Sequence, residues 1–181
     1  MSNVHNDVER VLYTAEQLKE RVDELGRQIT AEYANEPVML VGILRGAATF
    51  MTDLARAIDL PVEMDYMSVS SYGDDTQSSG RVRIVQDVSL KVEDKHIIIV
   101  EDVLDTGLTL SHLVKRFSVL GPRSVSVAAL MKKDTPGQLD VNCRYVGFDC
   151  PNEFIVGYGL DYAQRYRNLP YIGVLKPEIY S

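Results

Sequence analysis

The apolar residues in the first third of the chain follow helical spacing and then strand-like spacing. Thr14 and Gln17 have the spacing of a capping box, and apolar positions follow at three- and four-residue steps, at Leu18, Val22, Leu25, Ile29 and Tyr33. This pattern predicts an amphipathic helix. The run from Val38 to Leu44 has no polar residue and is too short for a long helix, so it predicts a strand buried on both faces.

The same alternation continues through the rest of the chain. Helical spacing over 48–58 is followed by a strand pattern over 62–69, a β-rich stretch over 82–90 and the run Ile97 to Val100. A helix over 109–120, stopped by Gly121-Pro122, and a strand over 125–131 come next. Strands that alternate with helices pair in parallel through right-handed crossovers. We therefore expect an α/β fold with a three-layer, mostly parallel twisted sheet flanked by helices, and a ligand site beyond the carboxyl ends of its strands.

Size and charge narrow the classes of protein. With about 150 residues per domain as a guide, the 181 residues predict a single domain over 1–181. The net charge of −7 disfavours non-specific binding to nucleic acid or to an anionic membrane. Cys143 and Cys150 are too few for a disulfide framework, and no apolar run approaches the about 18 residues of a membrane span. The N-terminus carries acids where a signal peptide would be apolar, so we expect a cytoplasmic protein.

The segment IIIVEDVLDTGLTL, residues 97–110, holds the most informative chemistry. A buried strand leads into two carboxylates, a third carboxylate, Thr-Gly and the start of a helix. At that start several N–H groups lack partners within the helix, Gly107 allows close approach, and the hydroxyls of Thr106 and Thr109 add donors. These features predict a binding site for a phosphate monoester.

The neighbouring acids suggest that a sugar accompanies the phosphate. Glu101 and Asp102 can accept hydrogen bonds from ribose hydroxyls, or they can attract Mg²⁺, whose charge offsets their repulsion of phosphate. A structural interpretation is also open, in which Asp105 and Thr106 only cap the helix and the two acids lie on a solvated strand end. The long Ile-Val run before the acids favours the functional interpretation.

At this point the chain resembles the phosphoribosyltransferase family. That family's diphosphate-sugar motif is an apolar strand followed by two acids, two apolar residues, Asp, a small hydroxyl residue, Gly, one further residue and Thr, and VEDVLDTGLT fills every position. The segments ILRGA, SSYGDDTQSSG, LMKKDTP and FIVGYGLDYAQRYRNLPYIG look like the remaining segments of the hypoxanthine-guanine branch. The resemblance covers nearly the whole chain and implies a small hood built from terminal segments.

The resemblance implies that the chain transfers phosphoribosyl from 5-phosphoribosyl 1-diphosphate to a free oxopurine, giving a nucleoside monophosphate and pyrophosphate. Backbone groups of Leu44-Arg45-Gly46 would bind the pyrophosphate, often across a non-proline cis peptide, and relatives commonly have Lys at the Arg45 position. A polar segment over 70–80 would close over the site as a lid, with Ser71-Tyr72 at its tip. The sugar donor would also contact Glu101, Asp102, Asp105, Thr106, Gly107, Leu108 and Thr109.

The same resemblance implies roles around the purine. Lys133 matches a lysine that donates to the six-oxo group, although the neighbouring Lys132 leaves the register open. Phe154 would stack on the base, and the backbone of Ile155 would read its edge. Asp105 would act as the general base, or as a hydrogen-bond acceptor, at the imidazole nitrogen.

A magnesium ion on the diphosphate is part of the implied mechanism. Glu101, Asp102 and Asp161 would be its carboxylate partners, and Arg167 would contact the departing diphosphate. His5, His96 and His112 have no metal-ligand spacing, so the sequence predicts no zinc site made by protein groups alone.

Several alternatives stay open at the level of sequence. The base could be hypoxanthine, guanine, xanthine or adenine, since a few contacts decide this choice. A different class is a nucleotide-sensing, RNA-binding regulator of the same fold, which the net charge of −7 and the complete base-site match disfavour. The chain has neither GxGxxG nor a Walker loop, so a dehydrogenase or nucleoside-triphosphatase is not favoured. The family resemblance suggests a homodimer or homotetramer.

Overall fold

The computed structural model of the protein describes residues 4–71 and 82–180. A six-stranded sheet with the order β4-β3-β2-β5-β6-β7 forms its centre. All neighbouring strands pair in parallel except β4, which is antiparallel to β3 at the edge. The strands are β2 (Val38–Leu44), β3 (Val62–Ser71), β4 (Val82–Gln86), β5 (His96–Leu104), β6 (Ser124–Lys133) and β7 (Cys143–Cys150). The predicted α/β fold with a mostly parallel sheet is confirmed.

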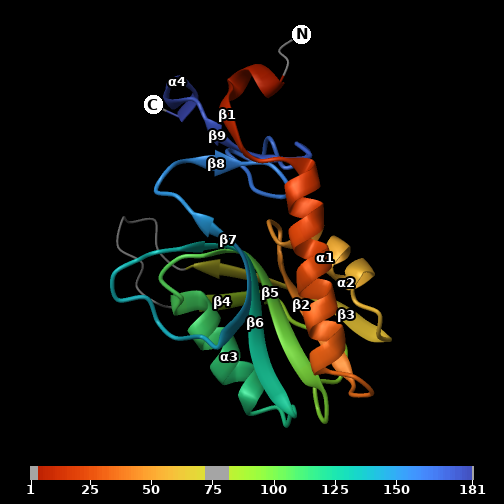
Figure 1. Ribbon diagram of the computed structural model, residues 1–181. Helices are drawn as coiled ribbons and strands as arrows, with labels where there is room; N and C mark the ends of the chain where they lie inside the picture. Colours follow the sequence, from red (N-terminus) through yellow and green to blue (C-terminus); the bar gives the residue numbers. More distant parts are fainter. Residues whose placement is uncertain (1–3, 72–81, 181) are drawn as a thin grey trace.

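Helices cover both faces of this sheet (Figure 1). On one face lie α1 (Ala15–Glu32) and α2 (Ala48–Ala57), and on the other lies α3 (Leu108–Ser118). The capping box is present, with the Gln17 N–H donating to Thr14 Oγ1 and the Thr14 N–H donating to Gln17 Oε1. The apolar side of α1 packs on the sheet through buried residues that include Leu18, Leu25 and Ile29. Separate apolar clusters therefore fill the space on the two sides of the sheet.

A smaller sheet forms a hood from the two ends of the chain. Strands β1 (Val8–Tyr13), β8 (Ile155–Val156) and β9 (Ile172–Leu175) pair antiparallel in the order β1-β9-β8. A 3-10 turn, η1 (Val4–Asp7), and α4 (Pro177–Tyr180) flank it. The hood stands beyond the carboxyl end of β7 (Figure 1), where a ligand site is expected. The predicted hood is confirmed.

Some element boundaries differ from the sequence prediction. Strand β5 continues to Leu104, so Glu101 and Asp102 lie within the strand, because Val103 and Leu104 still pair with Met131 and Lys132 of β6. Helix α3 begins at Leu108 and ends at Ser118, two residues before the predicted end at Leu120.

The predicted lid over 70–80, including Tyr72 at its tip, lies almost wholly outside the described residues. Within the two described ranges, none of the helices has the length and apolar character required to cross a membrane.

Gly26 lets α1 and α2 approach closely. A Cβ at this position would lie 2.5 Å from both the Cβ and the carbonyl oxygen of Ala57. Helix propensity alone would make Gly26→Ala more stable by up to about 1 kcal/mol. We expect the clash to dominate, so that the free energy of unfolding falls by about 1–3 kcal/mol. Urea unfolding measures this change, with Arg27→Ala on the exposed side of the same helix as the control. A more stable Gly26→Ala variant would contradict the packing argument.

Candidate active site

Two cavities lie where loops leave the carboxyl ends of β2, β5 and β6. One, of about 380 Å³, is lined by Asp102, Asp105, Lys133, Phe154 and Asp161, among others. The second, of about 290 Å³, is lined by residues of β2, β3 and β5 and by the segment from Asp105 to Thr109. Most of the site residues expected from the sequence therefore gather around two neighbouring cavities that share Asp105.

The anion loop, residues 105–109, joins β5 to α3. Gly107 precedes the helix with a φ of +79°, in the left-handed region that favours glycine. A Cβ there would also lie 3.0 Å from the Leu139 carbonyl oxygen. Within the part of the chain that the structure describes, no side chain caps α3 from its N-cap position, although the Leu108 N–H donates to Thr106 Oγ1 at 3.5 Å. The helix start is thus left open toward the 290 Å³ cavity, which favours an anion site over a purely structural cap.

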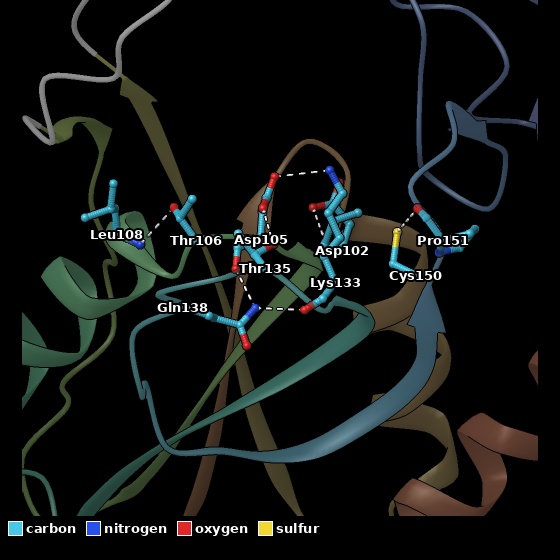
Figure 2. A network of polar contacts seen from close by, with 10 residues as sticks. Asp102, Asp105, Thr106, Leu108, Lys133, Thr135, Gln138, Cys150 and Pro151 are labelled. Atoms are coloured by element: carbon cyan, nitrogen blue, oxygen red, sulfur yellow. Dashed lines mark hydrogen bonds and ion pairs between the residues drawn. The ribbon is translucent and has the colours of Figure 1, made fainter.

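The Asp105 carboxylate is held by two donors from the β6 side (Figure 2). Thr135 Oγ1 donates to Asp105 Oδ1 at 2.8 Å, and Lys133 Nζ donates to Asp105 Oδ2 at 3.1 Å. The hydrogen bond from Thr135 lowers the pKa of Asp105, and the charge and hydrogen bond of Lys133 lower it further against the opposing effect of burial. Asp105 is therefore ionised at neutral pH and able to accept a proton.

The two lysines at the end of β6 lie in different surroundings. Lys133 lines the 380 Å³ cavity together with Phe154 and Ile155. Lys132 instead lines a separate cavity with Gln138 and Leu139. Successive side chains of a strand point to opposite faces, which accounts for the difference. Of the two, Lys133 is the lysine that can meet a ligand beside Asp105.

Glu101 and Asp102 are close in space but line different cavities. Glu101 lines the 290 Å³ cavity and Asp102 the 380 Å³ cavity. Burial raises the pKa of Glu101 well above its usual range, and the charge of Asp102 adds to this effect. A hydrogen bond from the Asp102 backbone opposes these effects only weakly, so a cation in this region would favour the charged form of Glu101. Such a pair of acids fits a magnesium ion that is held mainly by substrate oxygens.

The loop between β2 and α2 is packed tightly against the acids and the hood. The Leu44–Arg45 peptide bond is cis, as the family resemblance implies. A Cβ at Gly46 would lie 1.5 Å from Asp102 Oδ2, and a Cβ at Gly159 would lie 2.3 Å from the Gly46 carbonyl oxygen. Only glycine at both positions allows this approach. The loop is thus wedged between β5 and the hood.

Two arginines project from the same region. Arg45 Nη1 donates to Gln164 Oε1 at 2.9 Å, and Arg167 Nη2 donates to the same oxygen at 3.1 Å. Arg167 also pairs with Asp161 at 2.8 Å and donates to the Gly159 carbonyl oxygen at 2.7 Å. The pairing of Arg167 with Asp161 joins two residues whose expected roles are separate. Because they share one acceptor, the two guanidinium groups lie close together and can both donate to a strongly anionic group.

Phe154 offers an aromatic face at the rim of the 380 Å³ cavity. Its ring stacks on that of Tyr180, with centroids 4.9 Å apart and an angle of 23°, and it meets Tyr162 edge-on at 5.3 Å. Its exposed fraction is 36%. Ile155, in β8, lines the same cavity. Phe154 is therefore a supported and accessible platform for a planar ring.

Some predicted residues are not joined into one centre. Ser71 ends β3 and its side chain is not described, while Tyr72 lies outside the described residues. Among residues 4–71 and 82–180, no three His, Cys, Asp or Glu side chains form a group able to hold a metal ion. Glu101, Asp102 and Asp161 are thus not a preformed metal centre made by protein groups alone.

Sequence reasoning missed residues that surround the expected site. Thr135 and Gln138 contact Asp105 from about 30 positions further along the chain, at separations of 30 and 33 residues. Gln164 joins the two arginines, and Tyr180 supports Phe154. These four residues lie in loops or in a short terminal helix, where neither periodicity nor motif spacing marks them. Thr135 and Gln164 lie in segments that resemble the family, LMKKDTP and FIVGYGLDYAQRYRNLPYIG, but neither residue carries a distinct signal there.

Comparison with known families and proteins agrees with this geometry. Residues 11–163 match the phosphoribosyl transferase domain. The chain is 48% identical over 176 residues to a hypoxanthine-guanine phosphoribosyltransferase of Bacillus subtilis, covering 97% of this chain and 98% of that protein. It is 51% identical over 179 residues to a bifunctional protein TilS/HprT of Listeria innocua, covering 99% of this chain. The chain spans 28% of the length of that Listeria relative.

Solved structures show the same similarity in three dimensions. A hypoxanthine phosphoribosyltransferase from Staphylococcus aureus superimposes with a TM-score of 0.93 at 44% identity, covering 100% of this chain and 99% of that one. A hypoxanthine phosphoribosyltransferase from Trypanosoma cruzi, in a ternary complex with substrates, gives a TM-score of 0.90 at 36% identity, covering 97% of this chain and 100% of that one.

Proposed function

The chain belongs to the phosphoribosyl transferase domain family, and we propose that it transfers phosphoribosyl from 5-phosphoribosyl 1-diphosphate to hypoxanthine or guanine in purine salvage. The observation that carries this proposal is the placement of Lys133, Asp105 and Phe154 around one 380 Å³ cavity beside the anion loop. The similarity to relatives named hypoxanthine-guanine phosphoribosyltransferases supports it. We further propose that residues 1–181 act as one phosphoribosyltransferase domain.

The sugar donor is bound by two loops in this proposal. Its 5-phosphate lies at the anion loop, where the N–H groups at the start of α3 and the hydroxyls of Thr106 and Thr109 serve as donors. Its diphosphate lies against the backbone of Leu44, Arg45 and Gly46, with the guanidinium of Arg167 nearby. The ribose hydroxyls donate to Glu101 and Asp102.

Magnesium fits this proposal as a partner of the diphosphate. Asp102 and Asp161 line the 380 Å³ cavity, and Asp161 pairs with Arg167. Burial, and then the negative charge of Asp102, raise the pKa of Glu101, so a cation there would favour its charged form. When bound there, Mg²⁺ supplies positive charge that stabilises the departing diphosphate. Arg167 adds a donor to that group, and one preorganised donor of this kind contributes about 3–4 kcal/mol to transition-state stabilisation.

The reaction exchanges one bond at the anomeric carbon for another. The bond to the diphosphate oxygen breaks with its electron pair leaving on the diphosphate, and a ring nitrogen of the base forms the new bond with inversion. The proton on the imidazole ring of the base passes to Asp105, which is ionised at neutral pH. Phe154 holds the face of the base, and Lys133 donates to the six-oxo oxygen, where an amino group would meet another donor.

Product identification tests the proposed function. The protein is incubated with Mg²⁺, 5-phosphoribosyl 1-diphosphate and equal amounts of hypoxanthine, guanine, xanthine and adenine. Inosine or guanosine monophosphate as the main product supports the proposal, and the ratio of the two ranks the bases. Xanthosine or adenosine monophosphate would change the base within the same reaction. Absence of any nucleotide, together with tight binding of RNA, would favour a regulator of the same fold.

Lys133→Met tests how the base is selected. A hydrogen bond from a charged donor contributes about 1.5–3 kcal/mol, so we expect kcat/KM for the oxopurine to fall about 10- to 100-fold. The activity toward adenine should not fall with it, because Lys133 makes no favourable contact with an amino group. Steady-state kinetics with both bases measure the change. Lys132→Met is the matched control, since Lys132 lines a different cavity, and an equal loss in that control would count against the assignment of Lys133.

Location and assembly are further parts of the proposal. Both cysteines are free, Cys150 buried and Cys143 half-buried, which supports a reducing compartment such as the cytoplasm. The family resemblance supports a homodimer or homotetramer, and light scattering coupled to size exclusion measures that state. A fully active monomer would contradict the proposed homodimer or homotetramer.

A further inference from the structure

The clamp loop, which we define as residues 134–142 between β6 and β7, is bonded to the anion loop at three places. Thr135 Oγ1 donates to the Asp105 carboxylate at 2.8 Å. Gln138 Nε2 donates to the Asp105 carbonyl oxygen at 2.5 Å, and the Leu139 N–H donates to the Thr106 carbonyl oxygen at 3.0 Å. Two loops that are distant in sequence are thereby held as one unit.

Gln138 extends this unit to the end of β6. The same Nε2 also donates to the Lys133 carbonyl oxygen at 3.0 Å (Figure 2). A side-chain amide nitrogen carries two hydrogens, and in this arrangement each has an acceptor. One amide group thus bridges the main chain of the residue proposed as the base and the main chain of the residue proposed to read the purine.

These bonds also orient the anion loop. In a planar trans peptide the C=O and N–H groups point in opposite directions. The Asp105 carbonyl is bound by Gln138, so the Thr106 N–H of the same peptide unit faces the opposite way. The Thr106 carbonyl is bound by the Leu139 N–H, which orients the Gly107 N–H in the same manner. Thr106 and Gly107 line the 290 Å³ cavity, where an anion would need such donors.

From this geometry we propose that Gln138 is a positioning residue. It orients the Thr106 N–H toward a bound phosphate, and it fixes the spacing between Asp105 and Lys133 that the base requires. The role in spacing rests on the proposed function, whereas the role at the phosphate rests on the anion cavity alone. The imidazole nitrogen and the six-oxo oxygen, on one edge of an oxopurine, must meet Asp105 and Lys133 together. A shift of either main chain by a fraction of an ångström therefore weakens both contacts.

The residues around Gln138 indicate that its side chain positions the two loops and contributes little to the stability of the fold. Its side chain is half-buried, while Pro136, Gly137, Leu139 and Asp140 around it are exposed. Val141 is the buried residue of the clamp loop, and it is the one that joins an apolar cluster of the core. Loss of the amide should therefore disturb the loop and leave the core intact.

The experiment compares Gln138→Met with the wild-type chain. Methionine keeps the length of the side chain and removes both donors. Asp140→Ala is the matched control. Asp140 Oδ1 accepts from the Asn142 N–H at 2.9 Å within the same loop, and among the described residues Asp140 makes no hydrogen bond to the anion loop. Calorimetry measures binding of two probes, ribose 5-phosphate and inosine 5′-monophosphate, and thermal unfolding checks that each variant is folded.

We expect Gln138→Met to weaken both probes about tenfold and to lower kcat/KM for the oxopurine about 10- to 100-fold, with the control unchanged. Unchanged affinity for both probes in a folded Gln138→Met variant would overturn the proposal, as would an equal loss in Asp140→Ala. If Gln138→Met does not fold, Gln138→Glu takes its place, because glutamate keeps the shape of the side chain and loses the two amide hydrogens. The proposal is overturned if Gln138→Glu also fails to fold or shows no loss of affinity. Binding of ribose 5-phosphate needs no turnover, so this measurement tests the role of Gln138 at the phosphate by itself. A wild-type chain that makes no purine nucleotide would refute the proposed function but would leave this test intact.

Discussion

Asp105→Asn is expected to lower turnover about 10²- to 10⁴-fold while leaving the affinity for 5-phosphoribosyl 1-diphosphate largely intact. General-base assistance typically contributes a rate factor of this size, and asparagine keeps the shape of the side chain but does not accept a proton. The amide oxygen can still accept the hydrogen bond from Thr135, so the anion loop should keep its place. The loss should therefore appear in kcat.

The setting of Asp105 predicts that its strength as a base depends on whether the purine is bound. In the free protein, Thr135 and then Lys133 lower the pKa of this carboxyl, which keeps it ionised. In the proposed mechanism Lys133 turns to the six-oxo oxygen. We then expect its contribution to that lowering to fall, so that the pKa of Asp105 rises as the base binds. A carboxylate with a higher pKa is the stronger proton acceptor.

Steady-state and single-turnover kinetics test this prediction. Asp134→Asn is the control, because Asp134 is an exposed carboxylate nearby in the sequence of the clamp loop. Wild-type turnover in Asp105→Asn would remove Asp105 from the mechanism. A loss confined to the KM of the sugar donor would instead assign it to binding.

Gly46→Ala is expected to weaken binding of 5-phosphoribosyl 1-diphosphate about 10²-fold with little change in stability. The added Cβ would lie 1.5 Å from Asp102 Oδ2 and 2.5 Å from Asp102 Cγ, so the carboxylate must turn away or the loop must shift. A side-chain carboxylate can rotate without disturbing the core, and this is why the main cost should fall on binding. A misplacement of about 1 Å in a site is sufficient for a loss of this size.

A double-mutant cycle with Asp102→Ala separates the two routes. If Gly46→Ala acts by displacing the Asp102 carboxylate, it should add little in the Asp102→Ala background. Full additivity would show that the main chain of the loop carries the effect. Thr52→Ala, an exposed change in α2, is the control, and wild-type affinity in Gly46→Ala would contradict the role of this loop.

Local sequence was sufficient for the central elements. The capping box at Thr14 and the unbroken apolar run over 38–44 predict α1 and β2, because hydrogen bonds and burial over a few residues decide such elements. The anion loop was also predictable from the sequence, since a strand, Gly107 and the start of a helix follow one another. The roles of Lys133 and Phe154 came from resemblance to a family, and no local pattern assigns them.

The extension of β5 to Leu104 shows where local patterns stop. Two carboxylates in succession read as the end of a strand, yet pairing with β6 continues past them. The partner strand lies in a distant part of the chain, so its hydrogen bonds have no signature near Glu101. The same reason explains why β7 and the strands of the hood were not assigned from periodicity.

By itself, then, the sequence determined the alternation of strands and helices and the anion loop with its glycine, because each depends on interactions between residues that are close in sequence. The tertiary structure alone decided which lysine faces Asp105, how Gly46 lies against Asp102 and Gly159, and that Gln138 joins the clamp loop to the anion loop. These contacts bring together groups that are up to 113 positions apart, and they arise when packing of the sheet and the hood sets the distances between loops. Distances of that kind follow from how separate elements pack in space, so the order of residues along the chain does not display them.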